Sequence, residues 1–73
     1  MLNNFDIFFN TMQVFVDNAA LDVAESTTIR DALKKAGHNP EIYIVACNGE
    51  ITHENTSLRE GDKLELVKII SGG

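Results

Sequence analysis

Two glycines close the sequence, and they are the residues best placed to do chemistry. The chain ends in Ser71, Gly72 and Gly73. Because glycine has no Cβ, a glycine pair forms a thin and freely bending thread. Such a thread can enter a narrow tunnel in another protein and present its terminal carboxylate there. We therefore expect the carboxylate of Gly73 to be the reactive group, with Ser71 and Gly72 threading it into a partner.

The remaining side chains offer little catalytic chemistry. Cys47 is the single cysteine, and its place in an apolar run favours a buried packing residue over a nucleophile or ligand. His38 and His53 stand alone in polar segments, so their spacing does not predict a metal site. Asp62 follows a glycine, where we expect it to shape a turn. The sequence thus predicts neither a catalytic side chain nor a bound metal.

Length, charge and cysteine usage limit the classes of protein to be considered. A chain of 73 residues makes one domain with a small core. One cysteine leaves no internal disulfide and favours a reducing, cytoplasmic setting. Eleven acidic against six basic residues give a net charge of −5, which disfavours nucleic acid and anionic membranes and favours a basic protein partner. No apolar run approaches the roughly 18 residues of a membrane span, and the apolar start lacks the basic residues of a signal peptide.

The first half of the chain predicts a hairpin followed by a helix. Residues 12–16 and 21–24 alternate between apolar and polar side chains, as strands do. Asp17 and Asn18 lie between them and tolerate the backbone angles of a turn. Thr28 is a good N-cap, and the apolar residues after it recur at helical spacing. We therefore expect a helix over about residues 28–36.

The second half predicts strands. Residues 42–47 form a nearly unbroken apolar run, which indicates a central strand covered on both faces. The Asn48-Gly49 dipeptide is a strong hairpin signal, and residues 50–52 supply a short returning strand. After a polar loop and a glycine turn, residues 63–70 form the last strand, with alternating faces.

This order of elements predicts an α+β fold of the β-grasp (ubiquitin-like) type. The helical crossover allows the first and last strands to lie side by side and parallel, within a mixed four- to five-stranded sheet crossed by one main helix. We expect residues 12–73 to form this single domain with a flexible tail, and residues 1–11 to be a partly ordered extension or an added strand. The predicted core comprises Val14, Val16, Leu21, Ile29, Leu33, Ile44, Leu64 and Leu66.

Apolar residues beside the tail form a candidate docking surface. Val67 and Ile69 fall on the face of the last strand opposite its core positions, and Ile70 follows them. Two interpretations remain open. The second face of the sheet is either covered by residues 1–11 or free to dock a partner.

Several segments together resemble the ThiS and MoaD sulfur carriers. Residues 46–51 resemble the Val-Asn-Gly-Glu hairpin of that family, and residues 58–66 resemble its Leu-x-x-Gly-Asp turn and strand. Residues 28–33 are similar to its helix start, and the terminal glycine pair matches its ending. The resemblance covers about residues 12–73. It is closer to ThiS, because MoaD-like chains are usually longer and often carry proline before the tail. The 11-residue extension and the short segment between helix and strand depart from the family pattern.

The resemblance implies a sulfur carrier that acts as a co-substrate and not as an enzyme. A ThiF- or MoeB-type enzyme would use ATP to adenylate the Gly73 carboxylate. A persulfide from a cysteine desulfurase-type donor would displace AMP and leave a thiocarboxylate. A synthase such as the ThiG-type thiazole synthase of thiamine biosynthesis would accept the sulfur. The carrier itself would hold no permanent cofactor.

Two other functions share the same sequence features. A ubiquitin-like modifier would be adenylated in the same way, but Gly73 would then form an isopeptide bond with target lysines. A small interaction domain could also carry two terminal glycines incidentally. The sequence does not identify the pathway that accepts the sulfur, which could be thiazole, molybdopterin or tRNA thiolation.

Overall fold

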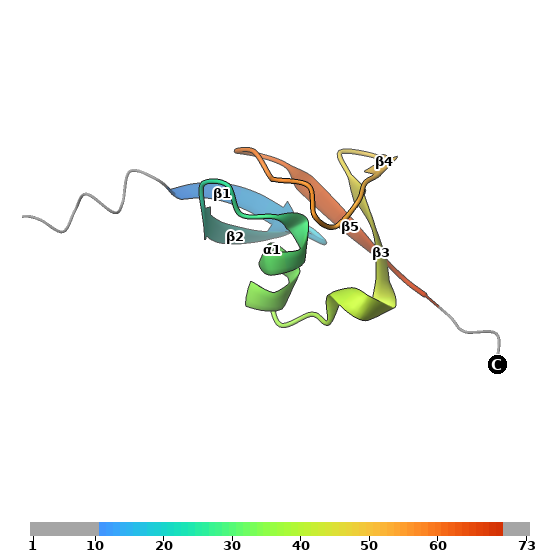
Figure 1. Cartoon of the computed structure of the whole chain (residues 1–73). Helices are drawn as coiled ribbons and strands as arrows, with labels where there is room; N and C mark the ends of the chain where they lie inside the picture. The colour runs from blue at the N-terminus through green and yellow to red at the C-terminus, as the bar shows by residue number, and fades with distance from the viewer. Residues whose placement is uncertain (1–10, 70–73) are drawn as a thin grey trace, which may run out of the picture.

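A computed structural model describes residues 11–69 of the chain (Figure 1). Residues 1–10 of the predicted extension, which covers residues 1–11, and the four residues from Ile70 to Gly73 lie outside the described part. Thr11, the last residue of that extension, is the first residue of β1. Within residues 11–69, one α-helix, one 3-10 helix and five strands follow one another. Their order is β1 (Thr11–Val16), β2 (Ala19–Ala24), α1 (Ile29–Lys35), η2 (Pro40–Ile42), β3 (Tyr43–Cys47), β4 (Glu50–Ile51) and β5 (Lys63–Lys68). No helix within residues 11–69 has the length and apolar character needed to cross a membrane.

The five strands form one mixed sheet in the order β2-β1-β5-β3-β4. β1 and β5 run parallel, whereas β1 with β2, β3 with β5 and β3 with β4 run antiparallel. Parallel neighbours need a long crossover, and the segment containing α1 supplies it. Figure 1 shows α1 and η2 on the same side of the sheet. The predicted β-grasp fold, a mixed sheet crossed by one helix, is confirmed.

Local chemistry explains the first hairpin. Met12, Val14 and Val16 are buried, and the polar or half-buried residues between them point to the other face. Asp17 and Asn18 both have positive φ, 50° and 71°. Two consecutive positive φ angles give the turn twist that matches paired strands, which is why Asp and Asn occur here. β2 begins at Ala19, two residues earlier than predicted, so the connection is as short as a hairpin allows.

The helix begins and ends close to the predicted positions. The Asp31 N–H donates to Thr28 Oγ1 at 3.2 Å, so Thr28 is the N-cap. The regular helix covers Ile29–Lys35, one residue shorter at each end than predicted, which is the usual scatter at helix ends. Ile29 and Leu33 are fully buried against the sheet. After the helix, Gly37 adopts a φ of 89°, a conformation that L side chains rarely take.

The core lies between α1 and one face of the sheet. Five of the eight predicted core residues are buried, and Leu21 and Leu66 pack against them while partly exposed. Buried positions beyond the predicted set are Met12, Val23, Ala32, Pro40, Val45, Ala46 and Leu58.

The prediction for Ile44 is wrong. Its side chain is 44% exposed, and Val45 takes the core position instead. The strand that contains both, β3, is not central, because β5 occupies the centre of the sheet. Nor is β3 covered on both faces: among the described elements only one face carries helices, and Ile44 points to the other. Ile42, predicted as the first residue of this strand, belongs to η2.

Candidate functional site

The last strand carries the chain toward the end that we predict to be reactive. β5 is central in the sheet, and the order continues to Ile69, whose N–H donates to Ile42 O at 2.8 Å. The predicted threading residues Ser71 and Gly72, the carboxylate-bearing Gly73 and the docking residue Ile70 all lie outside the described part of the chain. Gly73 lies four residues beyond Ile69, a reach of at most about 14 Å for an extended chain. β5 and Ile69 therefore fix where the thread starts.

Three hydrogen bonds that involve Asn48 fix the start of β5. Asn48 Nδ2 donates to Asp62 Oδ1 at 3.0 Å, and the Lys63 N–H donates to Asn48 Oδ1 at 3.0 Å. The Asn48 N–H donates to Lys63 O at 2.8 Å. The second carboxylate oxygen of Asp62 accepts from the Arg59 N–H at 2.8 Å, which confirms the prediction that Asp62 shapes its turn. The two motifs singled out in the sequence, Asn48-Gly49 and Gly61-Asp62, thus form one network in space.

A second network supports the middle of β5. β1 pairs with β5 only at Phe15 with Lys63 and Val16 with Leu64. Beyond Val16, Asp17 supplies the hydrogen bonds that β1 would otherwise make to β5. Its N–H donates to Leu64 O at 2.9 Å, and its Oδ1 accepts from the Leu66 N–H at 3.0 Å. Sequence analysis assigned Asp17 only to the hairpin turn. Its second role depends on a contact between residues 49 positions apart, which no local pattern reveals.

The exposed large hydrophobic residues of the described chain all lie on one face. They are Ile44, Ile51, Val67 and Ile69, with exposed fractions of 44%, 73%, 54% and 47%. Val67 faces Ile44 across β5 and β3, and Ile51 faces Ala46 across β4 and β3. Strand alternation places this face opposite buried Leu64, away from α1. We call these four residues the open-face patch.

The open-face patch extends the surface predicted from the sequence. Val67 and Ile69 lie on the face opposite the core, as predicted, whereas Ile44 and Ile51 were not predicted as docking residues. Strand alternation within residues 42–47 could have indicated that Ile44 faces away from the core. Because nearly every residue of that run is apolar, the alternation is not visible in the sequence. Val67 and Ile69 lie nearest the base of the tail, and Ile44 and Ile51 extend the patch across the sheet. Clustered apolar side chains of this kind are typical of a surface that contacts another protein.

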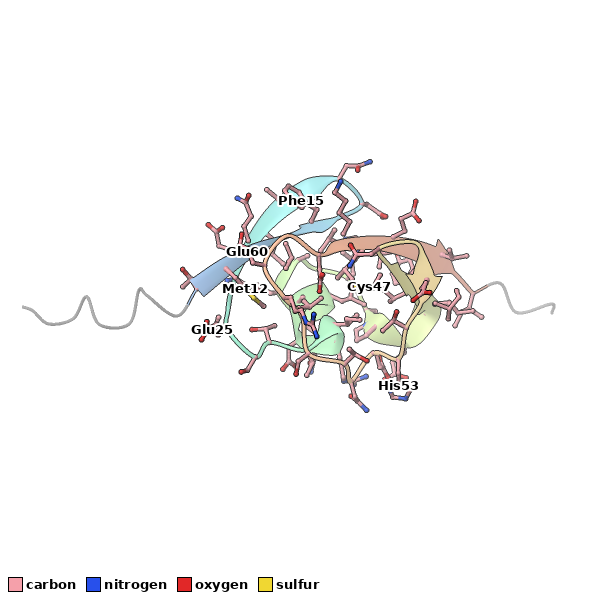
Figure 2. The ribbon with its side chains drawn as sticks, turned by 90° about the horizontal axis from the view of Figure 1, so that it is seen from above. Met12, Phe15, Glu25, Cys47, His53 and Glu60 are labelled. Carbon is pink, nitrogen blue, oxygen red and sulfur yellow. The ribbon has the colours of Figure 1, made fainter. Side chains whose placement is uncertain are left out.

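Charged groups flank the patch on one side and cluster at the opposite end of the molecule. Arg30 joins α1 to η2 and to the loop after β4, through Glu41 Oε2 at 3.0 Å and Glu54 Oε1 at 3.3 Å. Glu41 and Glu54, with Ile44 and Ile69, line a shallow hollow beside β3. Figure 2 shows Glu25 and Glu60 at the other end, where β1 begins.

Cys47 packs against the core and is half-buried. Burial raises the pKa of the Cys47 thiol, and the neighbouring Asp62 carboxylate raises that pKa further. The thiolate, which is the reactive form, is therefore disfavoured. This environment agrees with the predicted packing role.

The two histidines have local structural contacts. The His38 ring makes an edge-on contact with Tyr43, with ring centroids 5.7 Å apart. Nδ1 of His53 accepts from the Asn55 N–H at 3.1 Å. Within residues 11–69, His, Cys, Asp and Glu side chains form no group of three or more that could hold a metal ion.

The fold and the surface define the class of protein. A five-stranded mixed sheet crossed by one helix is the ubiquitin-like β-grasp, and an apolar face beside the base of the tail suits a protein that docks on others. Comparison with models of known protein families matches the ThiS family over residues 7–73. The chain belongs to the ThiS family of small ubiquitin-like sulfur carriers, as the resemblance predicted. Family membership implies interaction with adenylating and sulfur-accepting enzymes in general. Residues 1–6 lie outside the match.

Proposed function

We propose that this protein carries sulfur as a thiocarboxylate on Gly73 and is not itself an enzyme. The observation that carries the proposal is the match to the ThiS family, which runs through the terminal glycine pair to residue 73. Two features of the described chain support it. β5 is held by β3, β1, Asn48 and Asp17 up to the base of the tail, and the open-face patch lies beside that base.

The chemistry takes place on the tail and requires no side chain of this protein. A carboxylate is a poor acyl donor because its leaving group would be oxide. An adenylating partner of the ThiF or MoeB type joins the Gly73 carboxylate to the α-phosphate of ATP and releases pyrophosphate. The resulting acyl-adenylate has AMP as a good leaving group. The partner supplies positioning and electrostatic stabilisation, and ATP binds to the partner.

Sulfur then replaces AMP. The terminal sulfur of a protein persulfide, generated by a cysteine desulfurase-type donor, attacks the acyl carbon, and AMP leaves. The product is an acyl disulfide. A second thiol attacks its S–S bond, is oxidised to a disulfide with the donor cysteine, and releases the thiocarboxylate on Gly73. A sulfur-accepting synthase consumes this thiocarboxylate, and the resemblance to ThiS favours a ThiG-type thiazole synthase in the cytoplasm.

Docking is assigned to the open-face patch, with Val67 and Ile69 nearest the tail. The chain carries a net charge of −5, which favours a basic surface on the partner. A thread of glycines binds weakly by itself, since ordering it costs backbone entropy. The folded face therefore supplies the affinity and the tail supplies the reaction. Ile70, Ser71 and Gly72 bridge the two.

Intact-mass spectrometry after incubation with the adenylating enzyme encoded in the same genome tests this function. With ATP, wild type should gain the mass of AMP, and with a persulfide donor and a thiol it should exchange one oxygen for sulfur. Deleting Gly73 should abolish both changes without altering the melting temperature. Gly72→Val should block them because a β-branched side chain thickens and stiffens the thread. Adenylation of the Gly73-deleted chain would refute the assignment of the site.

The alternative function, a ubiquitin-like modifier, shares the adenylation step. The same experiment separates the two when it is extended to a cell lysate. A sulfur carrier accumulates as the free thiocarboxylate. A modifier appears as higher-mass conjugates joined through Gly73 to lysine side chains.

A further inference from the structure

β5 extends beyond the end of its parallel neighbour β1, which leaves a step in the sheet. β1 ends at Val16, opposite Leu64, and Asp17 extends the pairing only as far as the Leu66 N–H. Even-numbered residues of β5 direct their backbone groups to the β1 side: Leu64 O accepts from the Asp17 N–H there. Odd-numbered residues direct their backbone groups to the β3 side, and the Ile69 N–H accordingly donates to Ile42 O.

This alternation leaves three backbone groups without a partner among residues 11–69. They are the C=O of Leu66 and the N–H and C=O of Lys68, which point past the Asp17-Asn18 turn. We call this stretch, residues 66–68, the step edge. Lys68 is exposed, and the step edge lies on the strand that also carries Val67 of the open-face patch. Unpaired N–H and C=O groups in a row are a template for another strand.

The other edges of the sheet are partly covered. On β2, Lys35 Nζ donates to the Asp22 carbonyl, and the Thr27 N–H and Oγ1 donate to Ala24 O at 3.1 and 2.6 Å. β4 has only two residues, and the Thr52 N–H takes the Val45 carbonyl on β3. The rest of the outer edge of β3 lies in the hollow flanked by η2 and residues 52–54. Side-chain and loop groups thus occupy part of each outer edge, although the Ala20 N–H of β2 still points outward. The step edge has no such cover in the described chain, and it is the open edge that lies beside the base of the tail.

We propose that the activating partner adds an extended segment of its own backbone to the step edge and so continues the sheet. This inference rests on the proposed function and names how the partner holds the base of the tail. Backbone pairing at Lys68 would fix the direction in which the next residues leave the sheet. Gly73 lies five residues beyond Lys68, so the added segment would come from within about 17 Å of the partner's reacting centre.

A partner strand fits the step edge better than a second copy of this chain does. Two copies would each bring a net charge of −5 to the contact, and like charges oppose association. Self-pairing would also involve only residues 66–68 of each copy, because the Asp17-Asn18 turn ends the available edge. A partner strand would in addition bury Val67 and its neighbours on the adjacent open face, which joins backbone pairing to apolar contact.

Lys68→Pro is the direct test, because proline removes the N–H and places its ring where the added strand would pair. The fold should tolerate the change, since this N–H is unpaired in the sheet. Lys68→Ala keeps the N–H and removes only the side-chain charge. Ala20→Pro is the matched control, because Ala20 lies on β2, where the alternation set by Asp22 directs its N–H away from β1.

The assay is ATP-dependent adenylation of each full-length variant by the enzyme encoded in the same genome, read as AMP gained by intact mass. We expect Lys68→Pro to lower kcat/KM by about 10-fold or more, from the loss of one to three hydrogen bonds. Lys68→Ala should change it by no more than about 2-fold, and Ala20→Pro should leave it unchanged. A Lys68→Pro protein that is adenylated at the wild-type rate would overturn this inference and leave the proposed function standing. A wild type that never gains AMP would overturn both.

Amide hydrogen exchange on the wild type removes any dependence on folding of the variants. The Lys68 N–H should exchange freely in the isolated protein and become protected by about 10-fold or more when the enzyme is bound. The Ile69 N–H, already bonded to Ile42 O, should be protected in both states. Protection at Ala20 in place of Lys68, or protection of Lys68 in the isolated protein together with dimer formation in sedimentation, would contradict the proposal.

Discussion

Replacing Ile44 and Val67 with serine should weaken docking without weakening the fold. The two residues face each other across β3 and β5, on the face that carries no helix from residues 11–69. Each side chain is about half exposed, at 44% and 54%. A partner that covers this face removes the remaining apolar surface from water, and serine at either position forfeits that gain.

The magnitude follows from the exposed fractions. Complete burial of a valine or isoleucine side chain stabilises by about 1.5–3 kcal/mol. Because about half of each side chain is already covered in the free protein, docking can bury only the other half. Each substitution should therefore cost about 0.8–1.5 kcal/mol of binding free energy, a 4- to 12-fold rise in Kd. The double variant should lose less than the sum, since the two side chains are direct neighbours.

Titration calorimetry with the adenylating enzyme, without ATP, measures these Kd values. Ala24→Ser is a suitable control, because Ala24 is exposed on β2 and is not part of the open-face patch. The melting temperature of each variant should stay close to that of wild type, since exposed substitutions usually change stability by less than about 0.5 kcal/mol. An unchanged Kd for the double variant would refute the docking role. A large fall in melting temperature would show instead that the patch supports the fold.

Three further predictions concern the scaffold. Leu33→Ala should lower the free energy of unfolding by about 2–4 kcal/mol, because Leu33 is fully buried; a loss below about 1 kcal/mol in urea denaturation would contradict the assigned core. Asn48→Ala should cost about 1–3 kcal/mol, because Asn48 has a φ of 53° and its side chain bonds both Asp62 and the Lys63 N–H; an unchanged denaturation midpoint would argue against the network. Cys47 should be alkylated more slowly in the folded than in the urea-unfolded protein at pH 8, because its pKa is raised. Because folding raises this pKa, the thiol's contribution to stability is fully present below its unfolded pKa of about 8.5 and is lost as pH rises through the folded pKa. Cys47→Ala should therefore reduce the fall in the free energy of unfolding at alkaline pH. Equal slopes of that free energy against pH in wild type and variant would contradict this.

The parts of the fold that local chemistry controls were predictable from the sequence. The Asp17-Asn18 turn and the Thr28 cap depend on residues close in the chain, and both occur where expected. The topology followed because one hairpin, one crossover helix and a terminal strand leave few arrangements of a small mixed sheet. Family resemblance supplied the function, since no side-chain constellation in the sequence could have indicated sulfur chemistry.

The errors have a common physical origin. Ile44 and Val45 are both apolar and β-branched, so the sequence does not show which of them faces the helix. That choice depends on the register of β3 against β5, a contact between distant segments. The same holds for Asn48 and Asp62, whose side-chain bond joins two turns, and for the step edge, which exists only because β1 ends before β5 does.

The central claim is that Gly73 carries sulfur, and its most direct test is the mass of the chain taken from its native cells. The protein should be isolated rapidly under non-reducing conditions, digested, and its C-terminal peptide measured. Our account predicts a fraction of this peptide in which one oxygen of the Gly73 carboxylate is replaced by sulfur, and this fraction should disappear in cells that lack the adenylating enzyme. A C-terminal peptide found only as the carboxylate, or only joined to lysine side chains of other proteins, would contradict the account.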